Sequence, residues 1–271
     1  MVLQDKVVWI AGASSGIGKA VAYAFNHQGA RLVLSARREK ELYEVKSNCA
    51  RNEGDILVLP LDLQRLDELD EKARKAIGHF GKIDILINCV GVSQRSLAKD
   101  TDIKVDKTIM DINYFGAVGL TKAVLPYMLK RKAGHIVVIS SLTGYVGAPM
   151  RSAYAASKHA LHGFFDSLRG EVWRDNIYVT IVCPGFVRSG SIHKALTGDG
   201  SEYGKKEVEK RGAISPEVCA KHILKAVLKK REELYVGGKE TALIYVKRYF
   251  PRIFSWGLRT FKERFDEARD S

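Results

Sequence analysis

The sequence predicts an α/β protein with one doubly wound, mostly parallel sheet of seven strands and helices on both faces. Short apolar runs alternate with longer amphipathic runs through most of the 271 residues, as expected for parallel strands joined by crossover helices. A glycine-rich turn follows the first apolar run, and no linker-like segment or internal repeat interrupts the alternation. We therefore expect one domain over residues 1–238 and a helical extension over residues 239–271.

The expected strands are short and rich in β-branched and aliphatic residues, a composition typical of strands buried on both faces. They are Lys6–Ala11, Arg31–Ser35, Ile56–Leu59, Ile83–Ile87, Gly134–Ser140, Tyr178–Cys183 and Leu234–Val236. The two longest expected helices are Lys104–Arg131 and Ala153–Arg174.

A glycine turn, residues 12–18, joins the first expected strand to a run with helical spacing. Glycine permits a tight turn and a close approach of the backbone, and a helix N-terminus offers N–H groups to a pyrophosphate. The turn therefore predicts a Rossmann-type dinucleotide site, although its glycine spacing is G-x-x-x-G-x-G. The expected cofactor contacts here are Gly12, Ser14, Ser15, Gly16, Ile17 and Gly18.

The second expected strand ends at Ala36-Arg37-Arg38, where the adenosine ribose lies in this fold. An acidic residue there would favour NAD(H), whereas arginine suits a 2′-phosphate. We expect Arg37 to contact the cofactor and NADP(H) to be favoured over NAD(H); alternatively, the two arginines only open a charged helix. After the third strand, Asp62 is expected to contact adenine.

Tyr154 and Lys158 stand four residues apart, so a helix places them on one face, one turn apart. A free phenol has a pKa of about 10, a poor match to proton transfer at neutral pH. An ammonium about 4 Å away, at an effective dielectric of about 20, stabilises the phenolate by about 4 kcal/mol, or about three pKa units. The pair predicts an acid/base tyrosine, with a solvated helix face as the alternative.

Composition excludes several other classes of protein. The formal net charge is +13, but basic and acidic residues are interspersed and no nucleic-acid-binding signature occurs, so no nucleic acid is expected as a partner. The four cysteines lack metal-ligand spacing, and we expect no metal. Since no long apolar run or signal-peptide pattern occurs, we expect a cytoplasmic location in a reducing compartment, without a transmembrane span.

Six motifs in order carry a family resemblance. They are the three turn glycines, Asn88-Cys89-Val90-Gly91, Asn113, Ser141 thirteen residues before Tyr154, the Tyr154/Lys158 pair, and Pro184-Gly185-Phe186-Val187-Arg188-Ser189. From Asp5 to Val236 the chain resembles the short-chain dehydrogenase/reductase family, in the branch of about 250 residues. The run Asn113–Lys158 is similar to the dehydrogenase/reductase members 7 and 7B, relatives of 11β-hydroxysteroid dehydrogenase. Members of that subgroup generally carry an N-terminal membrane segment, which we do not expect here.

The resemblance implies a catalytic set of four residues. Tyr154 exchanges a proton with the substrate oxygen, Lys158 assists it and binds the nicotinamide ribose, and Ser141 donates a hydrogen bond to that oxygen. Asn113 holds a water that relays protons, or alternatively satisfies backbone groups inside its helix. The further cofactor contacts implied are Asn88, Gly91, Pro184, Gly185, Val187 and Ser189, with Asn88 mainly structural. A homodimer or homotetramer is also implied.

The segment Ser189–Gly212 is polar, glycine-bearing and poorly periodic, which suits a substrate lid. Substrate contacts are expected from Ser141, Tyr154 and Phe186. Apolar residues nearby predict a lipophilic carbonyl compound or secondary alcohol; they are Leu142, Tyr145, Val146, Phe186 and Val187.

The tail from Lys239 to Arg264 holds seven Lys or Arg against two Glu. Its apolar residues recur at helical spacing, which predicts a basic amphipathic helix; they are Phe254, Leu258, Phe261 and Phe265. One interpretation is peripheral membrane contact through residues 239–266; the other, slightly favoured, is packing on the domain or on a second subunit.

The leading functional hypothesis is an NADP(H)-dependent oxidoreductase that interconverts a carbonyl and a secondary alcohol by hydride transfer. The alternative is a non-catalytic dinucleotide-binding sensor or scaffold on the same fold. Such proteins typically lose the tyrosine or the lysine, and this sequence retains both Tyr154 and Lys158. A binder of nucleic acid or membranes driven by charge alone is the third hypothesis.

Overall fold

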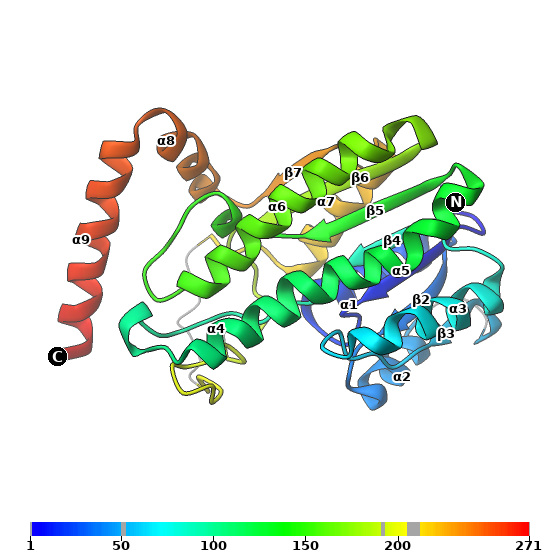
Figure 1. Ribbon diagram of the computed structural model, residues 1–271, viewed down its shortest axis with the longest axis horizontal. Helices are drawn as coiled ribbons and strands as arrows, with labels where there is room; N and C mark the ends of the chain where they lie inside the picture. The colour runs from blue at the N-terminus through cyan, green and yellow to red at the C-terminus, as the bar shows by residue number, and fades with distance from the viewer. Residues whose placement is uncertain (1, 50–52, 191–192, 205–211, 271) are drawn as a thin grey trace.

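Seven parallel strands form one sheet in the order β3-β2-β1-β4-β5-β6-β7, which confirms the predicted fold class (Figure 1). They are β1 (Val7–Ala11), β2 (Arg31–Ser35), β3 (Ile56–Val58), β4 (Ile85–Asn88), β5 (Gly134–Ile139), β6 (Ile177–Pro184) and β7 (Glu233–Val236). This computed structural model describes residues 2–49, 53–190, 193–204 and 212–270, without the side chains of 53 and 261–270.

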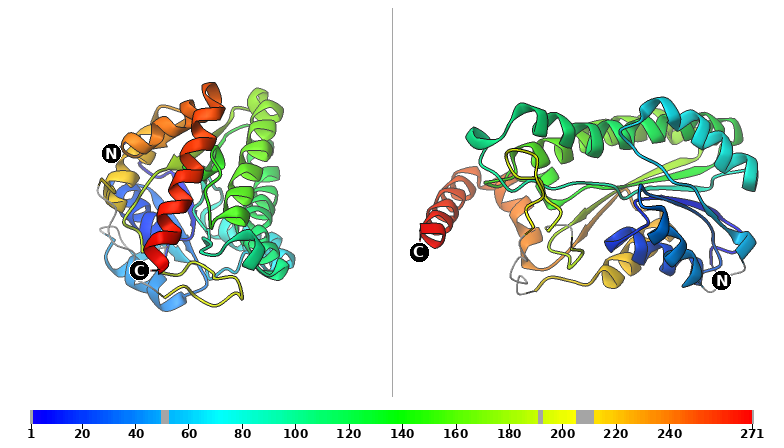
Figure 2. Two further views of the ribbon diagram at one scale, coloured as in Figure 1. Left: turned by 90° about the vertical axis from the view of Figure 1, so that its left-hand side faces the viewer. Right: turned by 90° about the horizontal axis from the view of Figure 1, so that it is seen from below.

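Helices cover both faces of the sheet (Figure 2). One face carries α1 (Gly16–His27), α2 (Glu39–Ser47) and α7 (Pro216–Leu228), and the other carries α3 (Leu69–Phe80), α5 (Gly116–Arg131) and α6 (Ser152–Val172). The expected helix Lys104–Arg131 is α4 (Ile103–Met110) and α5 joined by a π-helical turn, Asp111–Phe115. After β7 come a 3-10 turn (Lys239–Ala242), α8 (Leu243–Tyr249) and α9 (Pro251–Asp270).

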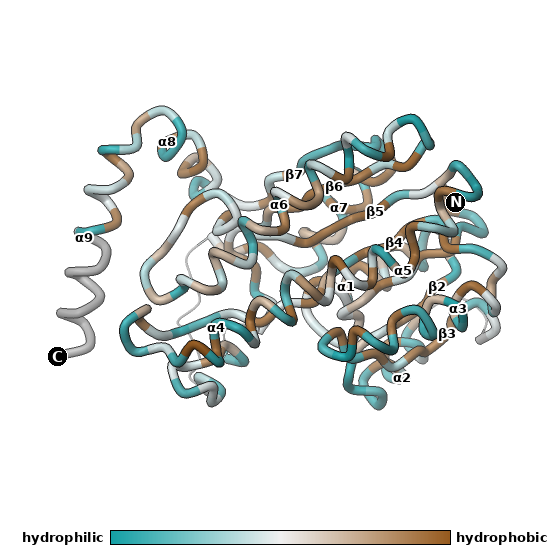
Figure 3. Tube along the Cα trace, viewed as in Figure 1, coloured by the Kyte–Doolittle hydropathy of each residue, from teal (hydrophilic) through white to brown (hydrophobic). Residues whose placement is uncertain are grey.

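The strands are apolar on both sides because each side meets a layer of helices. Val7, Trp9 and Ala11 of β1 belong to the core under α3, α5 and α6, whereas Val8 and Ile10 belong to the core under α1 and α7. All five residues of β1 are buried, and Figure 3 shows mostly hydrophobic colours along the strands. Within the described residues no helix combines the length and hydropathy needed to cross a bilayer.

The four cysteines are free. Burial raises the pKa of Cys49 to about 11 and those of Cys89 and Cys219 to about 12. Burial also raises the pKa of Cys183.

Asp84 joins three elements on the side of the sheet where β1 and β4 begin. Its carboxylate accepts a hydrogen bond from the Val7 amide at 2.9 Å and pairs with Lys82 at 2.9 Å and with Arg131 of α5 at 2.8 Å. Burial raises the pKa of this carboxyl, but the Val7 hydrogen bond and the two cations outweigh burial and leave the pKa below its ordinary value.

We expect Asp84→Asn to lower the free energy of unfolding at neutral pH by about 1–3 kcal/mol, because charge-assisted hydrogen bonds are lost. A carboxyl whose pKa is lowered by folding contributes stability above its unfolded pKa of about 3.9 and loses it as the pH falls through the folded pKa. The difference between the two proteins should therefore narrow as the pH falls below about 4. Urea unfolding over a pH series measures it, with the exposed Asp70→Asn as control. A difference independent of pH would contradict this account.

Candidate active site at the carboxyl edge of the sheet

The predicted site residues gather at one edge of the sheet, because parallel strands all end there. The glycine turn follows β1, Cys89-Val90-Gly91 follows β4, Ser140-Ser141 follows β5, and residues 184–189 follow or end β6. In the sheet, β1 lies between β2 on one side and β4 on the other, so the strand order reverses its direction beside β1. Such a switch point is where open α/β sheets bind ligands.

The turn after β1 leaves no room for side chains at two of its glycines. A Cβ on Gly12, whose φ is +94°, would lie 2.7 Å from the Cys89 carbonyl oxygen. A Cβ on Gly18 would lie 2.1 Å from the Gly12 carbonyl oxygen. A Cβ on Gly16 would meet the Ser189 side chain at 3.1 Å, so the segment after β6 lies against the turn.

The N-terminus of α1 is open to an anion. Its N-cap residue, Ser15, makes no side-chain capping hydrogen bond, and the first turn contains no acidic residue. The free N–H groups and the helix dipole favour a phosphate there. Ile17, also predicted to contact the cofactor, is half-buried in this first turn.

Arg38 reaches from the end of β2 to this turn. Its guanidinium donates hydrogen bonds to the hydroxyls of Ser14 at 3.1 Å and Ser15 at 3.2 Å. Arg37, the arginine we expected to contact the cofactor, is exposed. Asp62 is half-buried, and its carboxylate accepts a hydrogen bond from the Gln64 amide at 3.1 Å. The surroundings of α1 therefore offer donors and positive charge that fit a phosphate-bearing dinucleotide.

Tyr154 and Lys158 lie on one face of α6, as the spacing predicted. The Lys158 Nζ is 5.8 Å from the centre of the Tyr154 ring. Lys158 is 3% exposed, and its Nζ donates to the Ile139 carbonyl at the end of β5 at 2.9 Å. A Cβ on Gly91 would lie 3.3 Å from this Nζ, so the ammonium lies beside the segment that contacts Gly12.

The side chain of Asn113 is committed to neighbouring groups. Its Oδ1 accepts from the Val92 amide at 2.8 Å, and its Nδ2 donates to the Val92 carbonyl at 3.0 Å and to the Ser157 hydroxyl at 2.9 Å. The π-helical turn places Asn113 in this position, which ties the loop after β4 to α6. The side chain thus has the structural role that we left open, and the water relay stays a prediction. Asn88 likewise donates to Thr121 of α5 at 3.0 Å, in keeping with a mainly structural role.

Ser140 and Ser141 are neighbours in the sequence but make different contacts. The Ser140 hydroxyl forms a hydrogen bond of 2.9 Å with His162 Nε2 and lies 3.4 Å from the Lys158 carbonyl, so it is held between β5 and α6. Ser141 begins a 3-10 turn, Leu142–Gly144, that packs against α6, and its hydroxyl accepts from the Thr143 amide at 3.2 Å. The Ser141 hydroxyl keeps its own O–H to donate.

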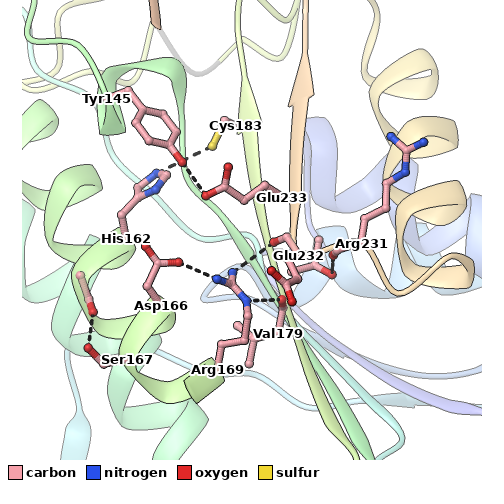
Figure 4. A network of polar contacts seen from close by, with 12 residues as sticks. Tyr145, His162, Asp166, Ser167, Arg169, Val179, Cys183, Arg231, Glu232 and Glu233 are labelled. Carbon is pink, nitrogen blue, oxygen red and sulfur yellow. Dashed lines mark hydrogen bonds and ion pairs between the residues drawn. The ribbon is translucent and has the colours of Figure 1, made fainter. Parts of the chain in front are cut away.

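A partly buried polar network joins α6, β6, β7 and the loop after β5 (Figure 4). Tyr145 donates to Glu233 at 2.7 Å, Tyr235 donates to the other oxygen of Glu233 at 2.5 Å, and His162 Nε2 is 3.7 Å from the Cys183 sulfur. Burial raises the pKa of Glu233, but the tyrosine hydroxyls outweigh it and lower the pKa; burial lowers the pKa of His162 to about 4. His162, Asp166 and Glu233 lie close enough to suggest metal ligands, but Asp166 pairs with Arg169 at 2.7 Å. Because both carboxylates already have donors, we interpret the cluster as a hydrogen-bond network that supports the β5–α6 junction.

The substrate side is described in part. The Phe186 amide donates to Glu240 at 3.2 Å, and the segment around Leu196 pairs with residues 93–95 through backbone hydrogen bonds. The expected lid also includes residues 191–192 and 205–211, which lie outside the described residues.

Comparison with known proteins identifies the family. The sequence model described as "short chain dehydrogenase" matches residues 6–199. The chain belongs to the short-chain dehydrogenase family. Members of this family are oxidoreductases that act on CH–OH groups, so the expectation of an enzyme is confirmed at that level.

Similar dehydrogenases occur in several animals. A dehydrogenase/reductase SDR family protein 7-like of Drosophila melanogaster is 42% identical over 259 residues, covering 94% of this chain and 79% of the relative. Member 7B of Xenopus tropicalis is 42% identical, with coverages of 93% and 84%, and member 7 of Homo sapiens is 40% identical, with coverages of 94% and 77%. The predicted resemblance to members 7 and 7B is confirmed.

Two solved structures share the fold of this dehydrogenase. A short-chain dehydrogenase from Streptomyces avermitilis has a TM-score of 0.77 at 26% identity, covering 98% of this chain and 97% of its own. A short-chain dehydrogenase/reductase from Burkholderia phymatum, in complex with NAD, has a TM-score of 0.82 at 21% identity, with coverages of 93% and 96%.

Gln94 of this dehydrogenase has a structural role that the sequence alone does not predict. It is 0% exposed, and its Oε1 accepts from the amides of Ala153 at 2.8 Å and Tyr154 at 3.4 Å, in the first turn of α6. Its Nε2 donates to the hydroxyls of Thr101 at 3.0 Å and Ser152 at 3.3 Å. The N-cap residue of α6 makes no side-chain capping bond, so Gln94 caps this helix from another segment and fixes the turn that carries Tyr154.

Gln94→Ala should lower the free energy of unfolding by about 1–3 kcal/mol, because buried N–H groups lose their acceptor. Amide hydrogen exchange should accelerate in the first turn of α6, which mass spectrometry of peptides covering residues 150–158 measures. Gln64→Ala, which alters an exposed glutamine, serves as control and should change neither quantity. Unchanged exchange in that turn would show that Gln94 does not hold it.

Proposed function

We propose that this chain is an NADP(H)-dependent oxidoreductase that interconverts a carbonyl and a secondary alcohol, with Tyr154 as the acid/base. One observation carries the proposal: Lys158 and Tyr154 share a face of α6, and the Lys158 ammonium lies beside Gly91. Gly91 is two residues after Cys89, whose carbonyl oxygen lies against the glycine turn. A phenol, an ammonium and an anion-binding turn at one sheet edge are the parts that such chemistry needs.

The residues at this edge fit a nicotinamide dinucleotide. The α1 N-terminus would hold the pyrophosphate, Arg38 and Arg37 the 2′-phosphate, and Asp62 the adenine. Asn88, Gly91 and the strand-end residues Pro184, Gly185, Val187 and Ser189 would face the nicotinamide half. When bound, the cofactor supplies or accepts the hydride.

Tyr154 gives its proton to the substrate oxygen during reduction and takes one back during oxidation. The Lys158 ammonium stabilises the phenolate that remains after proton donation, because opposite charges attract strongly where water is excluded. Ser141 donates a hydrogen bond to the same oxygen as negative charge develops on it. Asn113 ties the loop after β4 to α6 through its side-chain hydrogen bonds. A water near Asn113 would return protons to Lys158.

The substrate is a lipophilic carbonyl compound or its alcohol. Phe186, Val187 and Tyr145 are half-buried at the edge of the site and supply apolar surface, whereas Leu142 and Val146 are buried behind them. Apolar walls with a few polar groups are typical of small-molecule sites.

A homodimer or homotetramer through α4, α5 and α6 is part of the proposal, as is a cytoplasmic location. Ile103 is 76% exposed and Phe115 is 46% exposed, and together with Met110 and Ala156 they line an open apolar hollow on these helices. Exposed apolar patches of this kind mark interaction surfaces.

Tyr154→Phe should reduce turnover by about 10²- to 10⁴-fold, because general acid catalysis is lost, and should leave NADPH affinity nearly unchanged. The assay is NADPH oxidation over a panel of ketosteroids, retinals, acyl ketones and quinones. Tyr43→Phe, which alters a tyrosine that is 53% exposed, is the matched control. Activity retained by Tyr154→Phe would refute the assignment of the acid, and NADPH binding without turnover by the parent chain would favour the sensor alternative.

Arg38→Ala should weaken NADPH binding by about 10- to 100-fold, the loss expected for charge-assisted hydrogen bonds to a phosphate, and leave NADH binding nearly unchanged. Isothermal titration with both cofactors measures the difference. Lys40→Ala removes an exposed positive charge of the same helix and serves as control. Equal loss for both cofactors would refute the proposed preference.

A further inference from the structure

The two C-terminal helices, α8 and α9, present an apolar surface to solvent. Figure 2 shows α9 standing away from the layered body, and α9 packs on α8. Six large hydrophobic residues on these helices and the turn between them are exposed: Leu243, Tyr245, Tyr249, Phe250, Ile253 and Trp256. Phe254 and Leu258 of the predicted stripe are half-buried, whereas the side chains of Phe261 and Phe265 lie outside the described residues. The exposed face is therefore a different one from the predicted stripe.

This surface is strongly basic. Residues 241–260 contain four positive side chains, Lys247, Arg248, Arg252 and Arg259, and no Asp or Glu. Among the described side chains, none of the three arginines has a carboxylate partner. Hydrophobic and hydrophilic residues are interspersed along α8 and the first half of α9 (Figure 3).

Arg252 and Arg259 line an open hollow on α9. It is lined by Pro251, Arg252, Ser255, Trp256 and Arg259. Two guanidiniums and a hydroxyl can bind one phosphate group, and an indole beside them prefers the boundary between lipid headgroups and acyl chains. The chemistry of the hollow thus matches a phospholipid headgroup.

α8 and the turn before it contact both loops at the mouth of the site. Lys247 of α8 donates to the Tyr145 carbonyl, in the loop after β5. Glu240, in the turn before α8, accepts from the Phe186 amide, in the loop after β6. A body held by α8 and α9 would therefore present its substrate loops to the same surface.

We propose that α8 and α9 dock this protein on an anionic phospholipid bilayer. A second copy of the chain is the less favourable occupant, because a two-fold interface would bring this basic surface against itself. An anionic leaflet offers the complementary charge, and the exposed Tyr249, Ile253 and Trp256 insert at the headgroup level. The mouth of the site then faces the medium from which a lipophilic substrate partitions.

Tryptophan fluorescence of the full chain tests the docking face. The chain has three tryptophans, of which Trp9 is 0% exposed, Trp173 is 64% exposed and Trp256 is 67% exposed. In Trp173→Phe, phosphatidylcholine/phosphatidylserine vesicles with brominated acyl chains should quench Trp256 and shift its emission to the blue. Trp256→Phe, which keeps an equally exposed Trp173 on another face, should show neither effect. Absence of quenching in Trp173→Phe, or equal quenching in both variants, would overturn the proposal.

Charge reversal tests the electrostatic part. Arg248→Glu/Arg252→Glu/Arg259→Glu should weaken co-sedimentation with phosphatidylserine vesicles on the order of 100-fold, from about a fivefold effect per neutralised cation, with reversal adding to it. The control Lys221→Glu/Lys225→Glu/Lys229→Glu changes the net charge equally at exposed sites on α7 and its C-cap and should retain most of the binding. Equal losses in both triple variants would indicate general attraction by net charge and overturn the docking face.

Two further outcomes separate the other occupants, and none of these readouts needs turnover. If Arg248→Glu/Arg252→Glu/Arg259→Glu changes the oligomeric state in sedimentation velocity but keeps its vesicle binding, the face belongs to a contact with a second copy. Equal affinity of the parent chain for a DNA duplex and for the vesicles would indicate a general polyanion surface. Either result would overturn the proposal while leaving the proposed reaction untouched.

Discussion

The buried ammonium of Lys158 is the constraint on which the site depends. Placing a charge in a protein interior costs several kcal/mol unless hydrogen bonds or an opposite charge compensate it. Among the described residues, Lys158 has the Ile139 carbonyl as hydrogen-bond acceptor and no carboxylate partner. The remaining N–H groups can still donate, and a phenolate on Tyr154 or a ribose hydroxyl would accept from them. The strands and loops around Gly91 and Ile139 hold the ammonium in this position.

The parallel sheet explains why separate segments meet at this position. All seven strands end at one edge, so each following loop adds its residues to the same crevice. Close packing then narrows the choice of residues, since the turn after β1 lies directly on the carbonyl of Cys89. Gln94 and Asn113 fasten the loop after β4 to the beginning of α6 and to the π-helical turn. Because of these hydrogen bonds, the position of Tyr154 depends on three chain segments: the loop after β4, the π-helical turn and the first turn of α6.

Local patterns in the sequence predicted most of the fold. Apolar runs gave each strand to within about two residues, because a strand buried on both faces has a strong compositional signal. The shared face of Tyr154 and Lys158 followed from helical spacing alone. Gln94 was missed because a single glutamine in a loop has no periodicity, and its role depends on backbone amides 59 and 60 residues away. The reach of Arg38 to Ser14 and the outward face of α9 were missed for the same reason: side-chain rotamers and tertiary contacts decide them.

The thiols of this protein bear on its tolerance of reactive compounds. Thiolate, and not thiol, attacks electrophiles, and burial raises the pKa of all four cysteines, which disfavours the thiolate at neutral pH. Cys89 lies where the backbone touches the glycine turn, next to the crevice that would receive enones or quinones. A protonated sulfur there behaves as a small apolar group and is a poor nucleophile towards such molecules. The proposed crevice therefore exposes little thiolate to an electrophilic substrate.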